Sequence, residues 1–230
     1  MREVVLDTET TGFEPESGDR IVEIGAVELL NHLPTGRTYH QYINPERAMP
    51  KGAFEVHGLG DDFLRDKPVF AKIGQAFLDF IGSDKLVIHN ASFDMKFLNA
   101  ELGWMKLPVL PMDQAIDTLA IARKKFPGSP ASLDALCRRF GVNNTARTLH
   151  GALLDSEILA EVYLELIGGR QPDFVLAGAP KKPESNADVK DWRPGPRPDP
   201  LAARITDEET AAHAKFINSM GDGAIWKKLG

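Results

Sequence analysis

Four acidic residues in this sequence stand where apolar segments end or begin. Asp7 and Glu9 close the apolar run that opens the chain, Asp94 follows the run 86–88, and Asp155 opens the last long apolar segment. Because alternate residues of an extended chain point to the same side, Asp7 and Glu9 would present their carboxylates together. Neighbouring carboxylates repel each other and are good ligands for hard cations. The four acids therefore predict a divalent-metal site, although each one alone also fits a solvated turn or a helix start.

A histidine stands five residues before the last of these acids. Imidazole titrates near neutrality, so a neutral His150 could take a proton from a water molecule. Two cations held by four acids would activate that water, stabilise charge at phosphorus and support the departing oxygen. The predicted chemistry is phosphodiester hydrolysis. Taken alone, His150 could also cap the following helix or pack against it.

The surrounding elements must bring these residues together, and their apolar spacing indicates what they are. The predicted strands cover residues 3–7, 21–29, 38–43 and 86–88, with a turn at 31–36. The predicted helices cover residues 69–81, 92–102, 117–125, 132–140 and 151–167, and Ser92 is expected to cap the second. A meander of strands followed by alternating helices and strands predicts an α/β fold, with a mixed central sheet flanked by helices.

Charge and composition restrict the function further. The net charge of −6 argues against a broad basic surface for nucleic acid, so bound metals and a tethering partner would have to supply the attraction to DNA. The single Cys137 excludes an internal disulfide, and its helical spacing predicts a small buried side chain. No membrane span or signal peptide is recognisable, so we expect a cytoplasmic protein.

The character of the chain changes after residue 168. Residues 169–200 are rich in proline and poor in aliphatic side chains, which predicts a flexible linker that cannot offset its chain entropy by burial. In residues 201–230 a capping-box pattern, Thr206 to Glu209, precedes an apolar tail with Trp226. The tail has no core of its own, so we expect it to fold on a partner. The predicted domains are 1–168, a linker at 169–200 and a docking segment at 201–230.

The order Asp-x-Glu, Asp, His-x₄-Asp over residues 7–155 resembles the DEDD exonuclease superfamily, which has a ribonuclease H-like fold. The resemblance covers about residues 3–167. It points to the histidine branch, because the tyrosine branch has tyrosine where this chain has Gly151. The resemblance implies four acids that bind two Mg²⁺ or Mn²⁺ ions, with His150 as the general base. The implied metal ligands are Asp7, Glu9, Asp94 and Asp155.

Longer stretches resemble one branch of that superfamily, the epsilon proofreading subunits of bacterial DNA polymerase III. The similar stretches are residues 4–12, 24–28, 56–58, 86–90, 132–137 and 148–155. In this family the turn containing Thr10 and Gly12 binds the terminal nucleotide through backbone groups. The loop ending in His57 contacts the substrate and Phe93 shapes the pocket, although His57 could also be an ordinary loop histidine. Gly52 stands where some members have a glutamate. The implied substrate-binding set is Asp7, Glu9, Thr10, Gly12, Gly52, His57, Phe93 and Asp155.

The last sixty residues carry two further resemblances. Gln171, Phe174 and Leu176 resemble the short peptides that bind a sliding clamp (beta), with a plain linker as the alternative. Residues 206–213 and 223–226 resemble the family's segment that binds the polymerase alpha subunit, where Trp226 would be the anchor. A flexible linker would raise the concentration of the exonuclease at the primer end.

The resulting hypothesis is a proofreading 3′→5′ exonuclease that acts on single-stranded 3′ ends of DNA at the nucleoid. A free-standing relative acting on ends of short RNA or single-stranded DNA would share the catalytic residues but would need neither linker nor aromatic tail. A catalytically dead adaptor with this fold is the third hypothesis. The complete set of acids, with His150, argues against the adaptor.

Overall fold

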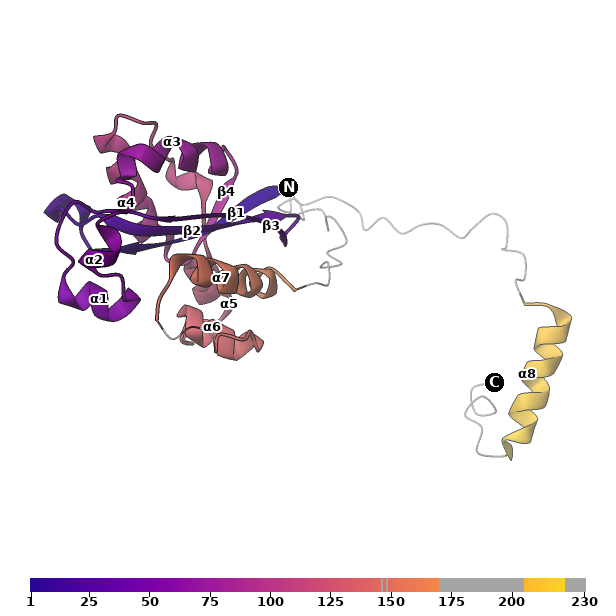
Figure 1. The fold of residues 1–230 in the computed structure, drawn as a ribbon. Coiled ribbons are helices and arrows are strands. Elements are labelled where there is room, and N and C mark those ends of the chain that lie inside the picture. Colours follow the sequence, from indigo (N-terminus) through magenta and orange to yellow (C-terminus); the bar gives the residue numbers. More distant parts are fainter. Residues whose placement is uncertain (146, 148, 170–204, 222–230) are drawn as a thin grey trace, which may run out of the picture. The chain divides into compact units, whose positions relative to one another are not determined.

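The computed structural model describes residues 1–145, 147, 149–169 and 205–221 (Figure 1). These residues fall into two parts, one before residue 170 and one after residue 204, and each is described by itself. The predicted linker lies almost entirely outside the described residues, and so do Gln171, Phe174, Leu176 and Trp226.

The first part is built on one mixed sheet. Its strands are β1 (Arg2–Thr10), β2 (Ile21–Leu30), β3 (Leu33–Tyr42), β4 (Lys85–Ile88) and β5 (Ala115–Asp117). They lie in the order β3-β2-β1-β4-β5, so β1 is the central strand. β1 pairs antiparallel with β2 and parallel with β4, and β4 pairs parallel with β5. The predicted α/β class with a mixed sheet is confirmed.

Helices cover both faces of the sheet. They are α1 (Lys51–His57), α2 (Asp61–Leu64), α3 (Phe70–Ile81), α4 (Ala91–Trp104), α5 (Thr118–Lys125), α6 (Leu133–Phe140) and α7 (Ala152–Leu166). Figure 1 shows α3 and α4 on one face, and α5, α6 and α7 on the other. Successive residues of a strand point to opposite faces, so Val4 and Leu6 join the core under α3 and α4, while Val5 joins the core under α6 and α7. This two-sided burial explains the continuous apolar run in β1.

Several predicted boundaries are wrong. The turn between β2 and β3 is only Asn31 and His32, both with positive φ (51° and 66°), so β3 begins at residue 33 and not at 38. Ser92 does not cap α4: that helix begins one residue earlier, and Asn90 is its N-cap, with φ 69°. Asparagine adopts this left-handed conformation more readily than most residues. His57 lies at the end of α1 and not in a loop.

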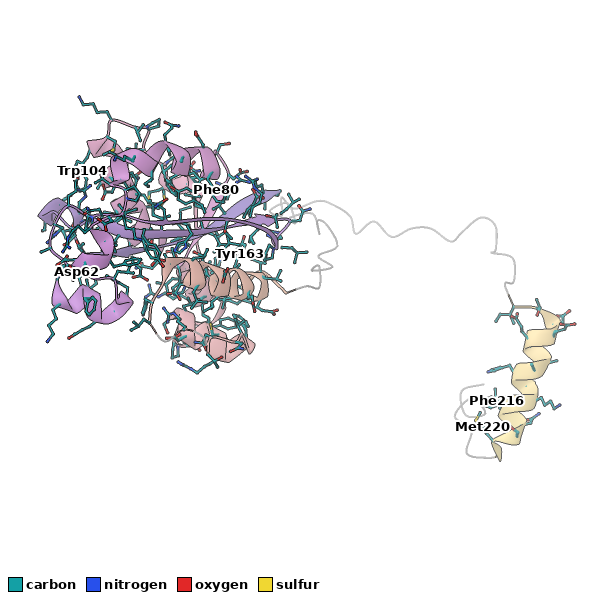
Figure 2. All side chains as sticks on the ribbon, in the orientation of Figure 1. Asp62, Phe80, Trp104, Tyr163, Phe216 and Met220 are labelled. Atoms are coloured by element: carbon teal, nitrogen blue, oxygen red, sulfur yellow. The ribbon has the colours of Figure 1, made fainter. Side chains whose placement is uncertain are left out.

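Two smaller expectations hold. Cys137 is buried in the core formed by α6 and α7. In the second described part, α8 (Asp207–Ser219) begins with the predicted capping box, since Thr206 and Glu209 each accept a hydrogen bond from the other's backbone N–H. None of the α8 residues is buried, and the side chains of Phe216 and Met220 are exposed (Figure 2). Among the described helices, none combines the length and apolar character that crossing a membrane requires.

Candidate active site

A cavity of about 940 Å³ opens at the end of the central strand. Its wall is formed by the end of β1, the turn that follows, α1, and the junction between β4 and α4. In open α/β sheets, ligands bind beyond the carboxyl ends of the strands. The lining residues include eight of the predicted metal-binding and substrate-binding residues together with His150, and Asp155 is not among them. They are Asp7, Glu9, Thr10, Gly12, Gly52, His57, Phe93, Asp94 and His150.

Asp7 and Glu9 both line this cavity from β1, two residues apart on one strand. Desolvation raises the pKa of Asp7 well above its ordinary value, and the charges of Asp94 and Glu9 add to the effect. Desolvation also raises the pKa of Glu9, to about 8, with further contributions from the charges of Asp155 and Glu23. Glu9 Oε1 is buried and has no hydrogen-bond partner among the described residues. Ionising both carboxyls at the end of β1 is therefore unfavourable in the structure as described.

Asp94 comes from the first turn of α4 and is buried. Thr8 Oγ1 donates a hydrogen bond to Asp94 Oδ1 at 2.7 Å, which ties the start of α4 to β1. Desolvation raises the pKa of Asp94, and the bond from Thr8 opposes that rise. Asp94 thus faces the same cavity as Asp7 and Glu9 while being anchored to the strand that carries them.

Asp155 reaches the site from the opposite face of the sheet, in the first turn of α7. One potential ligand atom each from Glu9, His150 and Asp155 lies within 4.8 Å of the others. Both oxygens of Asp155 accept hydrogen bonds from Arg147, from Nε at 2.5 Å and from Nη2 at 2.7 Å. Arg147 also donates to Asp134 at 3.0 Å. Because a carboxylate oxygen has two lone-pair directions, this pairing leaves Asp155 able to accept a further partner.

His150 is half exposed at the rim of the cavity. Its backbone N–H donates to the carbonyl of Val56 at 3.1 Å, which connects the segment before α7 to α1. Desolvation and the charge of Arg147 lower the pKa of His150, against the opposing charge of Asp155. The imidazole is therefore neutral near pH 7. Arg147 Nη2 lies 2.9 Å from His150 Nδ1 and donates to it in the neutral ring.

The turn after β1 is held by local hydrogen bonds. Thr10 Oγ1 donates to the carbonyl of Gly12 at 2.6 Å, and the backbone N–H of Thr11 donates to the carbonyl of Arg20 at 2.9 Å. A Cβ on Gly12 would lie 2.3 Å from a carboxylate oxygen of Asp19, so a side chain at this position would displace Asp19. Glycine at this position thus leaves room for Asp19 to pack directly against the turn.

The outer wall of the cavity comes from α1 and α4. His57 Nδ1 accepts from the backbone N–H of Leu59 at 3.1 Å, so the neutral ring carries its hydrogen on Nε2, which is buried without a hydrogen-bond partner among the described residues. Desolvation lowers the pKa of His57. Gly52 has open space where a side chain would begin. Phe93 packs on Phe97, with 5.0 Å between ring centroids.

Known proteins resemble this chain over nearly its whole length. Residues 4–163 match the family described as Exonuclease. The DNA polymerase III subunit epsilon of Rickettsia felis is 48% identical over 96% of this chain and 97% of the relative. The chain belongs to the DNA polymerase III epsilon-subunit family. The subunit epsilon of Escherichia coli K12, 42% identical over 98% of this chain and 97% of that relative, agrees.

Solved structures place the epsilon-family chain among known nucleases. Exonuclease X in complex with 5′ overhanging duplex DNA aligns with a TM-score of 0.57 and 28% identity, over 72% of this chain and 90% of that one. The nuclease domain of 3′hExo, described as a DEDDh family member bound to rAMP, aligns with a TM-score of 0.61 over 72% and 91% of the two chains. At 22% identity the second likeness concerns the fold alone. The ribonuclease H-like fold is confirmed, and the protein is a metal-dependent 3′→5′ proofreading exonuclease.

The donor set of this epsilon-family site suits divalent cations. Its ligand atoms are carboxylate oxygens, which hard cations prefer, with one imidazole beside them. Glu9 Oε1 has no hydrogen-bond partner among the described residues, and burial raises the pKa values of Asp7, Glu9 and Asp94, so a bound cation would favour their ionised forms. DEDD exonucleases generally use such ions, and the residues present here fit them.

The sequence did not predict which side chains donate hydrogen bonds to the acids of this site. Arg147 holds Asp155 and Thr8 holds Asp94, yet neither residue was singled out. Thr8 could have been suspected, since it stands between Asp7 and Glu9 on the strand. Arg147 lies in an irregular segment, where spacing along the sequence does not predict which side chains meet.

Proposed function

We propose that Asp7, Glu9, Asp94 and Asp155 hold two divalent cations, Mg²⁺ or Mn²⁺, and that His150 is the general base of nucleotide hydrolysis. The observation that carries the proposal is that one potential ligand atom each from Glu9, His150 and Asp155 lies within 4.8 Å of the others, while Asp7 and Asp94 line the same cavity as Glu9 and His150. The cations would supply charge stabilisation at the scissile phosphate and make a water molecule easier to deprotonate.

The protein's own residues would position the general base and accept the proton of the attacking water. A neutral His150 has one ring nitrogen without a hydrogen, and its lowered pKa keeps that nitrogen unprotonated near pH 7. In the structure Arg147 donates to His150 Nδ1. Proton transfer to Nδ1 therefore requires the guanidinium to move away from this nitrogen. Asp134, which already binds Arg147, offers the guanidinium a second anion to hold.

The cavity is suited to a single unpaired 3′-terminal nucleotide. The backbone from Thr10 to Gly12 would contact the nucleotide, and the Nε2–H of His57 would donate to one of its oxygens. Phe93 would pack against the base or sugar, while Gly52 leaves room beside it. A mispaired end unpairs at lower cost than a paired one, so it would reach such a site more often. Equal cleavage rates on paired and mispaired ends would contradict this selectivity.

The remainder of the chain would deliver the domain to its substrate. We place the exonuclease domain at 1–168, a linker at 169–200 and a docking segment at 201–230, as part of DNA polymerase III at the nucleoid in the cytoplasm. The support is the match to epsilon subunits over nearly their full length, together with the exposed Phe216 on α8. Gln171, Phe174 and Leu176 would bind the sliding clamp, and Trp226 would anchor the alpha subunit.

The test is digestion of 3′-labelled single-stranded DNA by the full chain with Mg²⁺, Mn²⁺ or EDTA. Nucleoside monophosphates should appear with either metal and not with EDTA. The Asp7→Ala, Glu9→Ala double variant should lose at least ~10³-fold in rate. Retained activity in that folded variant would refute the site. Failure of residues 201–230 to bind the alpha subunit would favour the free-standing alternative.

A further inference from the structure

Helix α7 carries Asp155 and begins two residues after His150, yet its own N-cap residue provides no side-chain cap. Its N-cap is Gly151, which has no side chain to accept a hydrogen bond from the first turn. The first backbone N–H groups of a helix have no acceptor within the helix and need one from elsewhere. In α7 the first such group belongs to Ala152, and it is buried against the sheet.

Glu23 provides that acceptor from β2. Its side chain is buried, with 3% of the residue exposed. Oε2 accepts a hydrogen bond from the backbone N–H of Ala152 at 3.2 Å. The other oxygen, Oε1, accepts from His40 Nε2 at 2.7 Å, across the β2–β3 pairing. Both oxygens are thus in use, and the negative charge lies at the positive end of the helix dipole.

Two further contacts hold the first turn of α7 against β2. A Cβ on Gly25 would lie 2.1 Å from the backbone nitrogen of Leu153, so the glycine allows α7 to approach β2 closely. Ser156 Oγ donates to the carbonyl of Gly25 at 3.0 Å. The first turn of α7 is therefore fixed to β2 immediately before and after Asp155.

We propose that Glu23 is a positioning residue, which caps α7 from the neighbouring strand and so fixes Asp155 and His150 relative to Glu9. Glu23 lies directly opposite Glu9 in the β1–β2 pairing, where two carboxylates repel each other. An apolar side chain would avoid that repulsion but would leave the Ala152 N–H without an acceptor. The proposal rests on the metal-binding role given above to Asp155.

The experiment compares Glu23→Ala and Glu23→Gln in the full chain, with two measurements. Mn²⁺ affinity is measured by calorimetry, and exchange of the Ala152 and Asp155 amides by NMR. Glu23→Ala should weaken Mn²⁺ binding about 10-fold, as loss of a group supporting metal ligands commonly does. It should also speed exchange of the two amides about 10-fold. Glu23→Gln keeps an acceptor oxygen and should stay within about 3-fold of the wild type in both measurements.

Glu28 offers a matched control on the same strand. Glu28 is also buried, but it lies toward the other end of β2, where it pairs with Arg2 of β1. Glu28→Ala should lower thermal stability while leaving Mn²⁺ affinity and the two amides unchanged. Equal losses of Mn²⁺ affinity in Glu23→Ala and Glu28→Ala would overturn the proposal, since they would mean that any weakening of β2 has the same effect.

A second variant restores a cap within the helix itself. Gly151 has extended backbone and open space for a side chain, so Gly151→Ser can accept from the first turn. Added to Glu23→Ala, it should recover part of the lost Mn²⁺ affinity, and no recovery would contradict the capping role. If Asp155→Ala leaves Mn²⁺ binding intact, the metal site itself is refuted. If Asp155→Ala weakens Mn²⁺ binding but Glu23→Ala does not, the metal site stands and the positioning role of Glu23 is refuted.

Discussion

The two halves of the candidate site are held in different ways. Asp7 and Glu9 project from the central strand, between two cores, and no cationic side chain pairs with them among the described residues. Asp155 projects from a helix on one face, and Arg147 engages both of its oxygens. In the strand half, ionising the buried acids is unfavourable, whereas in the helix half Arg147 balances the charge of Asp155. Replacing an aspartate by asparagine should therefore have opposite effects on stability in the two halves.

The largest effect should come from neutralising one acid in each half. Asp7→Asn and Asp155→Asn should both lower exonuclease activity at least ~10³-fold. In EDTA at pH 8, Asp7→Asn should be more stable than the wild type by about 1 kcal/mol, because a raised pKa means that ionising the group costs stability. Asp155→Asn should be less stable by about 3 kcal/mol, because it leaves a buried guanidinium poorly paired. Urea denaturation measures both, and stability changes of the same sign would contradict the contrast.

Removing Arg147 tests the helix half from the other side. Arg147→Ala should cost about 3 kcal/mol in EDTA, because only 10% of the Arg147 side chain and 4% of the Asp155 side chain are exposed. Mn²⁺ should restore more stability to this variant than to the wild type, since it supplies the missing positive charge. Arg65→Ala is the control: its pair with Asp62 is exposed, so its loss should change stability by less than about 1 kcal/mol. Equal losses in the two variants would refute the importance of the Arg147 pair.

The strain in the strand half predicts a pH dependence. The pKa of Glu9 is about 8 in the fold and near its ordinary value, 4.5, in the unfolded chain. The folded protein thus holds a proton that the unfolded chain has released, and this stability is lost as the pH rises toward and through 8. In EDTA the urea midpoint should fall between pH 5.5 and 8.5, and the fall should be smaller in Glu9→Gln. An equal fall in both proteins would show that Glu9 is not the source.

The smallest effect should follow loss of the Thr8 hydroxyl. Thr8→Val removes the donor to Asp94 and should cost about 1.5 kcal/mol at pH 8.5, where Asp94 is ionised. At pH 5.5 the carboxyl holds its own proton, because its pKa is raised, so the difference should shrink. Urea midpoints at the two pH values measure this. A loss that is the same at both would mean that packing, and not the hydrogen bond, is responsible.

The sequence allowed the four acids and His150 to be predicted, but not the side chains that hold them in place. The apolar run of β1 identifies a central strand, and the two-residue period places Asp7 and Glu9 on one side of it. β5 has three residues, too few for a recognisable period. The glycine at position 52 and the short length of α1 concealed a helix. Contacts such as Arg147 to Asp155, or Glu23 to Ala152, depend on how the helices pack, which periodicity does not encode.

The most direct test of the central claim is a crystal structure of the full chain grown with Mn²⁺, with the ions located by anomalous scattering. We expect two Mn²⁺ ions at the cavity, bound by oxygens of Asp7, Glu9, Asp94 and Asp155, with His150 beside them. Fully occupied Mn²⁺ elsewhere on the protein, and none in contact with these four carboxylates, would contradict the account.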